Sequence, residues 1–241
     1  QWDGGEGSAY EPAARAWPFV FPHEQGVDGF DGMALGQSAS PYLVEQYARA
    51  ASHFAPLVLA APRFSRCGRW AEIDASEKKD CARRSVAEFA MRAYRRPLQN
   101  HEKERLSVAH SRAMDAWGVD SGTTLAVQGI LQSPHFLYLV EVGRQGHQSA
   151  DTGTEVRTLT SWEMASRLSF FLWDTMPDDI LFDLAENDRL STRSQIREQA
   201  VRMLADPRAH QAVVHFHRQW LELDQVYENR ADLAVYAPLY D

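Results

Sequence analysis

From residue 41 onward, the apolar residues of this sequence recur at helical spacing, in segments that begin at capping residues and end near prolines. The first such segment, "SASPYLVEQYARAASHFAPLVLA", has Ser40 as a predicted N-cap and Pro41 at the first helical position. No stretch shows the alternation of apolar and polar residues that is typical of a strand with a hairpin turn. We therefore predict an all-α fold, a multi-helix bundle.

Further helix boundaries follow from the same signals. Ser76 is the predicted cap of a second helix, which Pro97 ends because proline lacks an N–H and disfavours helical geometry in the residue before it. Asn100 is the predicted cap of a third helix that runs through Trp117. A fourth helix is predicted in "SGTTLAVQGILQSPHFLYLVE", with an interruption at Pro134.

The chain divides into an arm and two helical domains. Residues 1–40 are rich in glycine, proline and aromatic residues without sustained periodicity, so we expect an extended, irregular N-terminal arm. Residues 41–143 form the first predicted helical domain, and the polar segment "GRQGHQSADTGTEVRT" marks a domain boundary. A second helical domain is predicted over 155–241, starting near a capping box formed by Thr160 and Glu163, and it is expected to continue beyond the last residue.

Composition excludes some classes of function. The chain is 44% hydrophobic and 24% charged, an ordinary globular mixture, and its formal charge of −8 argues against nucleic-acid binding. No apolar run approaches the roughly 18 residues of a membrane-spanning helix. Nothing at Gln1 resembles a signal peptide, although the chain could begin after one was removed.

The two cysteines, Cys67 and Cys81, frame the polar segment "GRWAEIDASEKKD". Their even number, their close spacing and this hydrophilic segment favour a disulfide, and hence an exported or periplasmic protein. The alternative is a pair of free thiols in a cytosolic protein. A metal site is disfavoured because neither cysteine belongs to a C-x-x-C pair.

Four stretches, in order, resemble a series of uncharacterised domains found in large exported bacterial proteins beside planctomycete-type cytochrome c modules. These are "DGFDGMALGQSASPYLVEQYARAA", "FAMRAYRRPLQNHEKERL" with its RRP signature, "ILQSPHFLYLVE", and "LTSWEMASRLSFFLWDTMPDDILFDLAENDRL" with "MLADPRAHQAVVHFHRQWLEL". They cover most of residues 25–225. Gly32 stands where the family commonly has asparagine, and the family pattern extends beyond both ends of this chain.

The resemblance implies an exported protein linked to electron transfer by c-type haem, and it assigns no mechanism. The sequence contains no C-x-x-C-H motif for covalent haem, so haem c is expected on a partner or elsewhere in the same protein. Non-covalent haem with histidine or methionine ligands is the alternative.

Histidines offer the strongest candidate ligands. His210 and His217 lie seven residues apart and therefore on one face of a helix, where Asp206 or Glu222 could join them around a metal or haem. No acidic-histidine motif supports such a site, so ordinary hydrogen-bonding histidines are the alternative reading, and no metal is predicted.

Two sets of side chains are candidates for docking a partner. The arginines are Arg83, Arg84, Arg95 and Arg96, which could instead pair with acidic residues of their own fold. The aromatic residues are Trp173 and Trp220, which could instead belong to the core.

Three functions are compatible with these observations. The first is an exported helical domain or subunit that scaffolds redox partners, a c-type cytochrome among them, in an electron-transfer assembly. The second is part of an enzyme, an oxidoreductase or a hydrolase, whose active site is completed by other segments. The third is a structural or binding module without a redox role.

Overall fold

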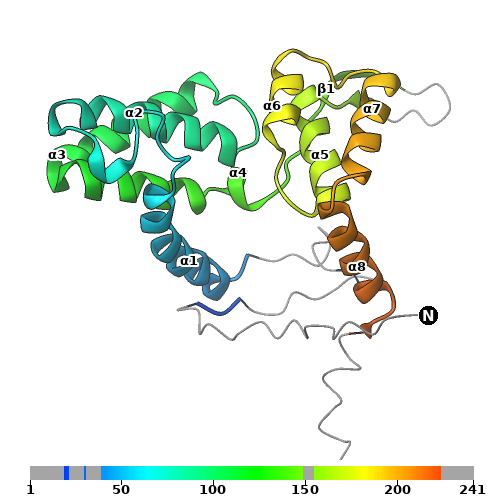
Figure 1. Ribbon diagram of the computed structural model, residues 1–241, viewed down its shortest axis with the longest axis horizontal. Helices are drawn as coiled ribbons and strands as arrows, with labels where there is room; N and C mark the ends of the chain where they lie inside the picture. The colour runs from blue at the N-terminus through cyan, green and yellow to red at the C-terminus, as the bar shows by residue number, and fades with distance from the viewer. Residues whose placement is uncertain (1–18, 22–29, 31–38, 149–154, 224–241) are drawn as a thin grey trace, which may run out of the picture.

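The computed structural model describes residues 19–21, 30, 39–148 and 155–223, and these form eight α-helices in two groups (Figure 1). The first group contains α1 (Pro41–Ala60), the 3-10 helix η1 (Trp70–Glu72), α2 (Ala75–Ala93), α3 (Asn100–Leu131) and α4 (Pro134–Leu137). The second contains α5 (Ser161–Trp173), α6 (Asp179–Glu186), α7 (Arg193–Leu204) and α8 (Arg208–Trp220). The prediction of an all-α fold is confirmed.

Helix α1 begins as the sequence predicts. The Ser40 hydroxyl accepts a hydrogen bond of 3.1 Å from the backbone N–H of Leu43, and Pro41 takes the first helical position. Most of the predicted arm lies outside the described residues. Of the described part, the backbone N–H of Val20 donates to Gln46 in α1 at 2.9 Å, and Phe30 stacks on Phe216 of α8 with 5.5 Å between ring centroids.

Two predicted caps were wrong by one or two residues. The N-cap of α2 is Asp74, whose carboxylate accepts from both the backbone N–H and the hydroxyl of Ser76. The N-cap of α3 is Gln99, so Asn100 is the first residue of that helix. In both cases a neighbouring side chain competes for the same unpaired N–H groups.

Helix α3 is broken at Gly118, which adopts φ 83° and ψ 166°. This break falls where the sequence predicts the end of one helix, at Trp117, and the start of another. The two halves of α3 pack closely against each other. A Cβ atom at Gly122 would lie only 2.5 Å from the backbone nitrogen of Met114. Glycine is required there for close packing.

A small hairpin, which the sequence signals do not predict, links the two groups. Strand β1 (Arg144–Gln148) pairs antiparallel with β2 (Glu155–Thr158), within the polar segment interpreted as a domain boundary. Val156 is the single apolar residue of the two strands, so the hydrophobic alternation that reveals strands is missing. The hairpin is instead held together by backbone hydrogen bonds between its two strands.

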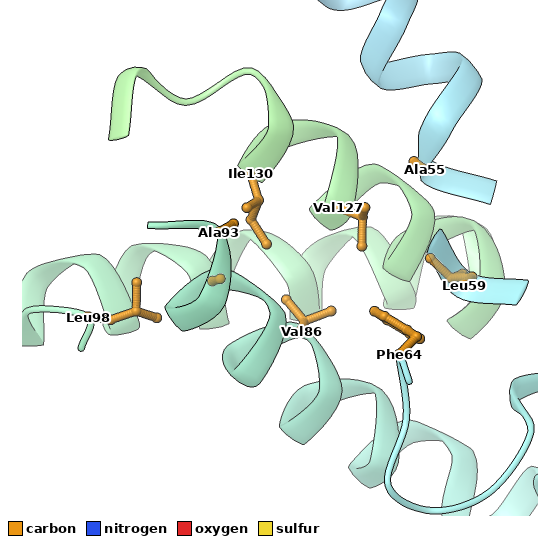
Figure 2. Packing of buried hydrophobic residues seen from close by; sticks show 9 residues of the cluster. Ala55, Leu59, Phe64, Val86, Ala93, Leu98, Val127 and Ile130 are labelled. Atoms are coloured by element: carbon orange, nitrogen blue, oxygen red, sulfur yellow. The ribbon is translucent and has the colours of Figure 1, made fainter. Parts of the chain in front are cut away.

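Each group has its own hydrophobic core. In the first, Figure 2 shows Val86 of α2 and Val127 of α3 close to Phe64, and all three side chains are buried. The second core is built around Leu181, Leu190 and Met203, all fully buried. Burying each such side chain contributes about 1.5–3 kcal/mol, so each group has an independent source of stability.

The helix starts of the second group follow the sequence signals. Thr160 and Glu163 form the predicted capping box of α5, and the Asp178 carboxylate caps α6 by accepting from the backbone N–H of Leu181 at 2.9 Å. Within the described residues, no helix combines the length and the apolar character needed to cross a membrane.

Candidate functional site

The RRP segment lies at the joint between the two groups, close to the short helix α4 (Figure 1). After α2 ends, Arg95 adopts a left-handed conformation with φ 57°, which is uncommon for a residue with a side chain. The side chains of Arg95 and Arg96 therefore point in directions that a regular helix would not give them. Arg95 is buried, with 8% of its surface exposed, whereas Arg96 is only partly buried.

The Arg95 guanidinium is surrounded by backbone carbonyl groups. Nη1 donates to the carbonyl oxygens of Ala93 and Phe136 at 3.0 and 3.1 Å, and Nη2 donates to those of His135 and Tyr138 at 2.8 and 2.9 Å. Burial, with the neighbouring charge of Arg96, lowers the pKa of Arg95. The side chain thus fastens α4 and the start of the connecting segment, residues 138–143 between α4 and β1, to the end of α2.

Arg96 forms a separate cluster with Glu102 and His135. Its two terminal nitrogens each donate to one carboxylate oxygen of Glu102 at 2.8 Å, and His135 Nε2 lies 3.2 Å from Glu102 Oε1. The hydrogen bonds from Arg96 are the main reason that the pKa of Glu102 falls to about 2. The same contact raises the pKa of Arg96. Glu102 is therefore ionised and holds the imidazole of His135 in one orientation.

Glu163 ties the connecting segment to α5. Its Oε1 accepts from the backbone N–H groups of Val142 and Gly143 at 2.7 and 2.9 Å, and its Oε2 accepts from the N–H and hydroxyl of Thr160, both at 2.8 Å. Burial alone would raise the pKa of Glu163, but these hydrogen bonds outweigh it and the pKa is lowered. Glu163 thus acts beyond the capping role that the sequence predicts.

These three clusters surround a cleft of about 440 Å3. Its walls come from the RRP segment, from the connecting segment up to Gly143, and from the first two turns of α5, including Trp162 and Ser166. Glu163 lines the cleft directly, and Glu102 binds two of its lining residues, Arg96 and His135; both carboxylates already accept several hydrogen bonds. The cleft therefore has oriented polar groups, but Glu102 and Glu163 are engaged in holding the backbone and neighbouring side chains together.

The four arginines predicted to dock a partner do not act alike. Arg95 is buried and Arg96 pairs with Glu102, so these two serve the fold rather than an exposed surface. Arg83 pairs with Asp80 at 2.9 Å. Arg84 is exposed and its Nη2 lies 3.5 Å from the sulfur of Cys67.

The two tryptophans also differ. Trp173 is buried with 3% exposed, donates from its indole nitrogen to the carbonyl of Met203 at 2.9 Å, and has the Arg208 guanidinium 3.5 Å from its ring centroid. It belongs to the second core, which corrects the expectation that it docks a partner. Trp220 at the end of α8 is 59% exposed, so its docking role stays a prediction.

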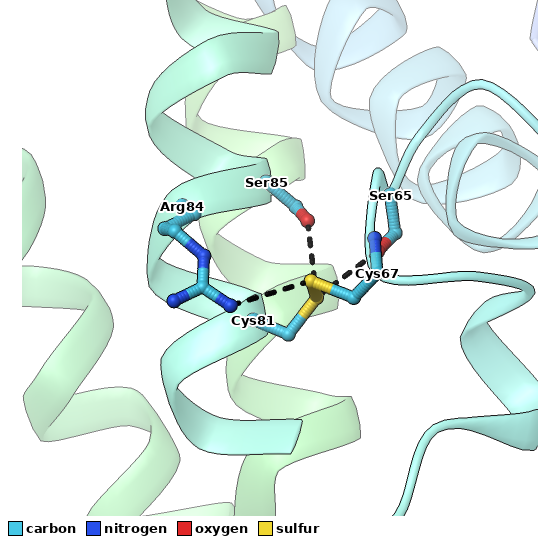
Figure 3. The surroundings of a disulfide bond; sticks show 5 residues. All are labelled: Ser65, Cys67, Cys81, Arg84 and Ser85. Atoms are coloured by element: carbon cyan, nitrogen blue, oxygen red, sulfur yellow. Dashed lines mark hydrogen bonds between the residues drawn. A yellow bond between two sulfur atoms is a disulfide. The ribbon is translucent and has the colours of Figure 1, made fainter. Parts of the chain in front are cut away.

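The predicted disulfide between Cys67 and Cys81 is present (Figure 3). Cys81 is completely buried on α2, and its sulfur lies 3.0 Å from the hydroxyl of Ser65. The bond fastens the loop that carries η1 to the first turns of α2. Cys67, in contrast, is an exposed residue.

The predicted histidine ligands lie on α8. His210 and His217 are both exposed, and His217 Nδ1 donates to the Val213 carbonyl at 2.7 Å. Asp206, which could have joined them, accepts two hydrogen bonds from the Arg208 side chain and one from its backbone N–H, and these lower the pKa of Asp206 to about 2. Among the residues that the structure describes, no three histidine, cysteine or acidic side chains are grouped to hold a metal. Ligation by these histidines stays a prediction.

The residues that bridge the two groups are not predictable from the sequence. Arg92 of α2 donates to Asp179 of α6 at 2.6 Å, and Arg167 of α5 pairs with Glu141 of the connecting segment. Arg92 belongs to the RRP stretch, but the sequence carries no signal for a partner 87 residues away. Glu102 lies in the same stretch, and the sequence alone gives it no role.

Comparison with known proteins identifies two domains in this chain. Residues 81–141 match a family model described as PSD5, a protein of unknown function (DUF1595), and residues 159–241 match PSD4, a protein of unknown function (DUF1592). Neither a curated protein nor a solved structure matches. Both domains are known as planctomycete cytochrome c-associated domains. Two segments of the chain thus match, in order, the family models of the DUF1595 and DUF1592 domains of this cytochrome c-associated series.

Proposed function

We propose that this chain is an exported helical scaffold of a cytochrome c-linked electron-transfer assembly, which positions redox partners and does not itself carry the haem. The association of both domains with cytochrome c supports the setting. The disulfide supports an oxidising compartment such as the periplasm, because thiols are kept reduced in the cytosol.

The observation that carries the scaffold role is the environment of Arg95. This arginine of the RRP signature is buried and donates to four backbone carbonyls, which belong to two segments about 40 residues apart in the chain. A guanidinium with all these donors engaged holds segments in place and has little capacity to bind a substrate. Its neighbour Arg96 is held by Glu102 in the same way.

Covalent haem does not fit the cysteines of this chain. Haem c attachment uses a C-x-x-C-H motif, which is missing from the sequence, and Cys67 and Cys81 are joined to each other. In the proposed assembly, haem c belongs to a partner or to another part of the same protein. The exposed Trp220 at the end of α8 is the proposed contact for such a partner.

The second candidate function is an enzyme domain whose active site other segments complete. The observation in its favour is His135, which Glu102 orients at the edge of the cleft beside Tyr94, with 5.2 Å between the two rings. An imidazole held by a carboxylate is a common arrangement for proton transfer. His135→Gln distinguishes the two functions. A scaffold would keep the electron-transfer rate of the assembly, whereas an enzyme that uses His135 for proton transfer would lose its activity.

The experiment is the isolation of the native assembly with this chain tagged. A Soret absorbance band with c-type haem spectra is expected in the purified material, and a colourless assembly would remove the redox role. Trp220→Ala is expected to lower the amount of cytochrome retained. Trp117→Ala is the matched control, because Trp117 is similarly exposed (64% against 59%) but lies in the other group.

A further inference from the structure

A second cavity, of about 560 Å3, opens in the first helical group, away from the polar cleft. Its volume falls within the roughly 300–1,000 Å3 of small-molecule sites. Aromatic and aliphatic side chains of α1, α2, α4, the end of α3 and the loop after α1 make its walls, and Met176 approaches from the loop before α6. The principal wall residues are Tyr47, Phe54, Val58, Phe64, Phe89 and Phe136.

The charged groups at this cavity carry an excess of positive charge. Arg63, Arg92 and Glu88 line it. Arg92 pairs with Asp179 at 2.6 Å, and Arg66 pairs with Glu88 at 2.8 Å. The arginines are thus Arg63, Arg66 and Arg92, and the carboxylates are Glu88 and Asp179. The positive charges outnumber the negative ones by one.

Arg63 is the arginine best placed to bind an incoming anion. Its Nη1 lies 3.7 Å from Asp179 Oδ2, at the outer limit of an ion pair, and its side chain is 87% exposed. Arg92 already holds the other oxygen of Asp179 at the shorter distance of 2.6 Å. A ligand carboxylate could thus take both nitrogens of the Arg63 fork without breaking a strong contact.

The rim of the cavity leaves apolar surface in contact with water. Phe21 is 46% exposed, and Phe54 and Met176 are each 37% exposed. An apolar chain that filled the cavity would remove this surface from water, which is favourable in proportion to the area covered. A ligand with an apolar body and one negative end therefore matches both features of the cavity.

We propose that this cavity binds one long-chain carboxylate, with its alkyl chain between α1, α2 and α4 and its carboxylate on Arg63. A chain with a cationic end would bring like charges together at the rim. A neutral chain would gain the apolar contacts alone. This proposal is independent of the redox role proposed above, because it uses neither the cleft nor α8.

The test uses dodecanoate, dodecanol and dodecyltrimethylammonium, which share one chain length and differ in charge. Each is titrated into the oxidised full chain by calorimetry below its micellar concentration. Dodecanoate is expected to bind once per chain, about tenfold more tightly than dodecanol, because only its carboxylate can form an ion pair with the Arg63 guanidinium. Dodecyltrimethylammonium is expected to bind least.

Two variants and a control locate the site. Arg63→Gln is expected to weaken dodecanoate about tenfold and to leave dodecanol unchanged. Ala51→Phe is expected to abolish binding of both, because Ala51 is buried in the cavity wall with 2% exposed. Arg69→Gln is the matched control, since Arg69 is also exposed, with a long 3.6 Å contact to Glu72, and does not line the cavity.

Three results would overturn the proposal. They are the lack of saturable dodecanoate binding, equal affinity for the anionic and cationic chains, and equal affinity of Arg63→Gln and Arg69→Gln for dodecanoate. Arg63 is exposed, so its replacement leaves the fold intact, and the Arg63→Gln comparison stands even where Ala51→Phe fails to fold.

Discussion

Arg92 in α2 and Asp179 at the start of α6 are joined by a hydrogen bond of 2.6 Å between Nη1 and Oδ1, across 87 residues of sequence. The Arg92 guanidinium also lies 5.1 Å from the centroid of the Phe182 ring in α6. Asp179 is more exposed than Arg92, with 63% against 35% of the side chain accessible. The contact therefore connects the two helical groups at their surface.

We expect a coupling energy of only about 0.5–1 kcal/mol between Arg92 and Asp179, because exposed ion pairs are screened by water. A double-mutant cycle with Arg92→Gln and Asp179→Asn, measured by urea unfolding, tests this value. The coupling should decrease in high salt. A coupling above about 2 kcal/mol would contradict the expectation that this exposed pair contributes little to joining the two groups.

Arg95→Lys is expected to destabilise the protein by about 2–4 kcal/mol, because an ammonium group has three donors and cannot reproduce the planar guanidinium fork. Carbonyl groups around the buried side chain would lose their partners. The free energy of unfolding in urea measures the effect. The control is Arg69→Lys, an exposed position where a change within about 0.5 kcal/mol is expected. Similar values for the two variants would refute the role of Arg95 in fastening α4 to the end of α2.

Glu102 gives a stability that depends on pH in the acid range. Since its pKa is lowered from 4.5 to about 2 in the folded protein, its contribution is fully present above pH 4.5 and is lost as pH falls towards 2. Glu102→Gln should therefore be less stable than the wild type by about 1.5–3 kcal/mol at pH 7. This difference should shrink below pH 4.5.

Unfolding of both proteins across this pH range is the measurement. Glu104→Gln provides the control, because Glu104 is an exposed residue on the same helix. A gap between wild type and Glu102→Gln that stays constant from pH 7 to pH 2 would show that Glu102 does not bind Arg96 as a carboxylate.

His110 is expected to give a second loss of stability on acidification, which begins at a higher pH than that of Glu102. It is buried in α3 with Nε2 at 3.2 Å from the Thr123 hydroxyl, and burial, aided by the charge of Arg83, lowers its pKa. The unfolded chain then takes up a proton at about pH 6.5 while the folded protein does not. Stability is therefore complete above that pH and decreases as pH falls below it.

The comparison of His110→Gln with wild type tests this expectation, since glutamine can also donate to Thr123 but does not titrate. The variant should lose less stability than the wild type between pH 7 and pH 5. His101→Gln, at an exposed position of the same helix, should behave like the wild type. An NMR titration that places the pKa of His110 at or above 6.5 would contradict the prediction.

Loss of the disulfide is expected to destabilise the chain by about 3 kcal/mol, the value for a loop of about 15 residues in the chain-entropy model. Urea unfolding of the Cys67→Ser, Cys81→Ser double variant measures this loss. Mass measurement after alkylation checks the starting point: the purified protein should take up no label before reduction and two labels after it. Labelling of both thiols without reductant would remove the argument for export.

Local chemistry made several helix boundaries predictable. Ser40 and Thr160 cap their helices as expected, and α3 ends shortly before Pro134, because caps and prolines act on backbone groups within a few residues. Asn100 was misplaced for the same reason, since its neighbour Gln99 takes the cap position. The hairpin escaped prediction because its nearly all-polar strands give no hydrophobic pattern.

The roles of individual side chains depended on partners far along the chain. Arg95 and Arg96 are adjacent and chemically identical, and their spacing gives no sign that one is buried and the other pairs with Glu102. Arg95 reaches the His135 and Tyr138 carbonyls because its left-handed backbone turns it away from the helical course and because α4 packs beside it.

The same holds for Trp173, whose helical spacing suits a core residue and a docking residue equally. Packing of α7 and Arg208 against it makes it a core residue. Helix type and helix ends thus follow from neighbours within a turn, whereas burial follows from contacts that form only when distant helices pack. A pattern of residue types does not specify those contacts, because several arrangements of the same amphipathic helices would satisfy it.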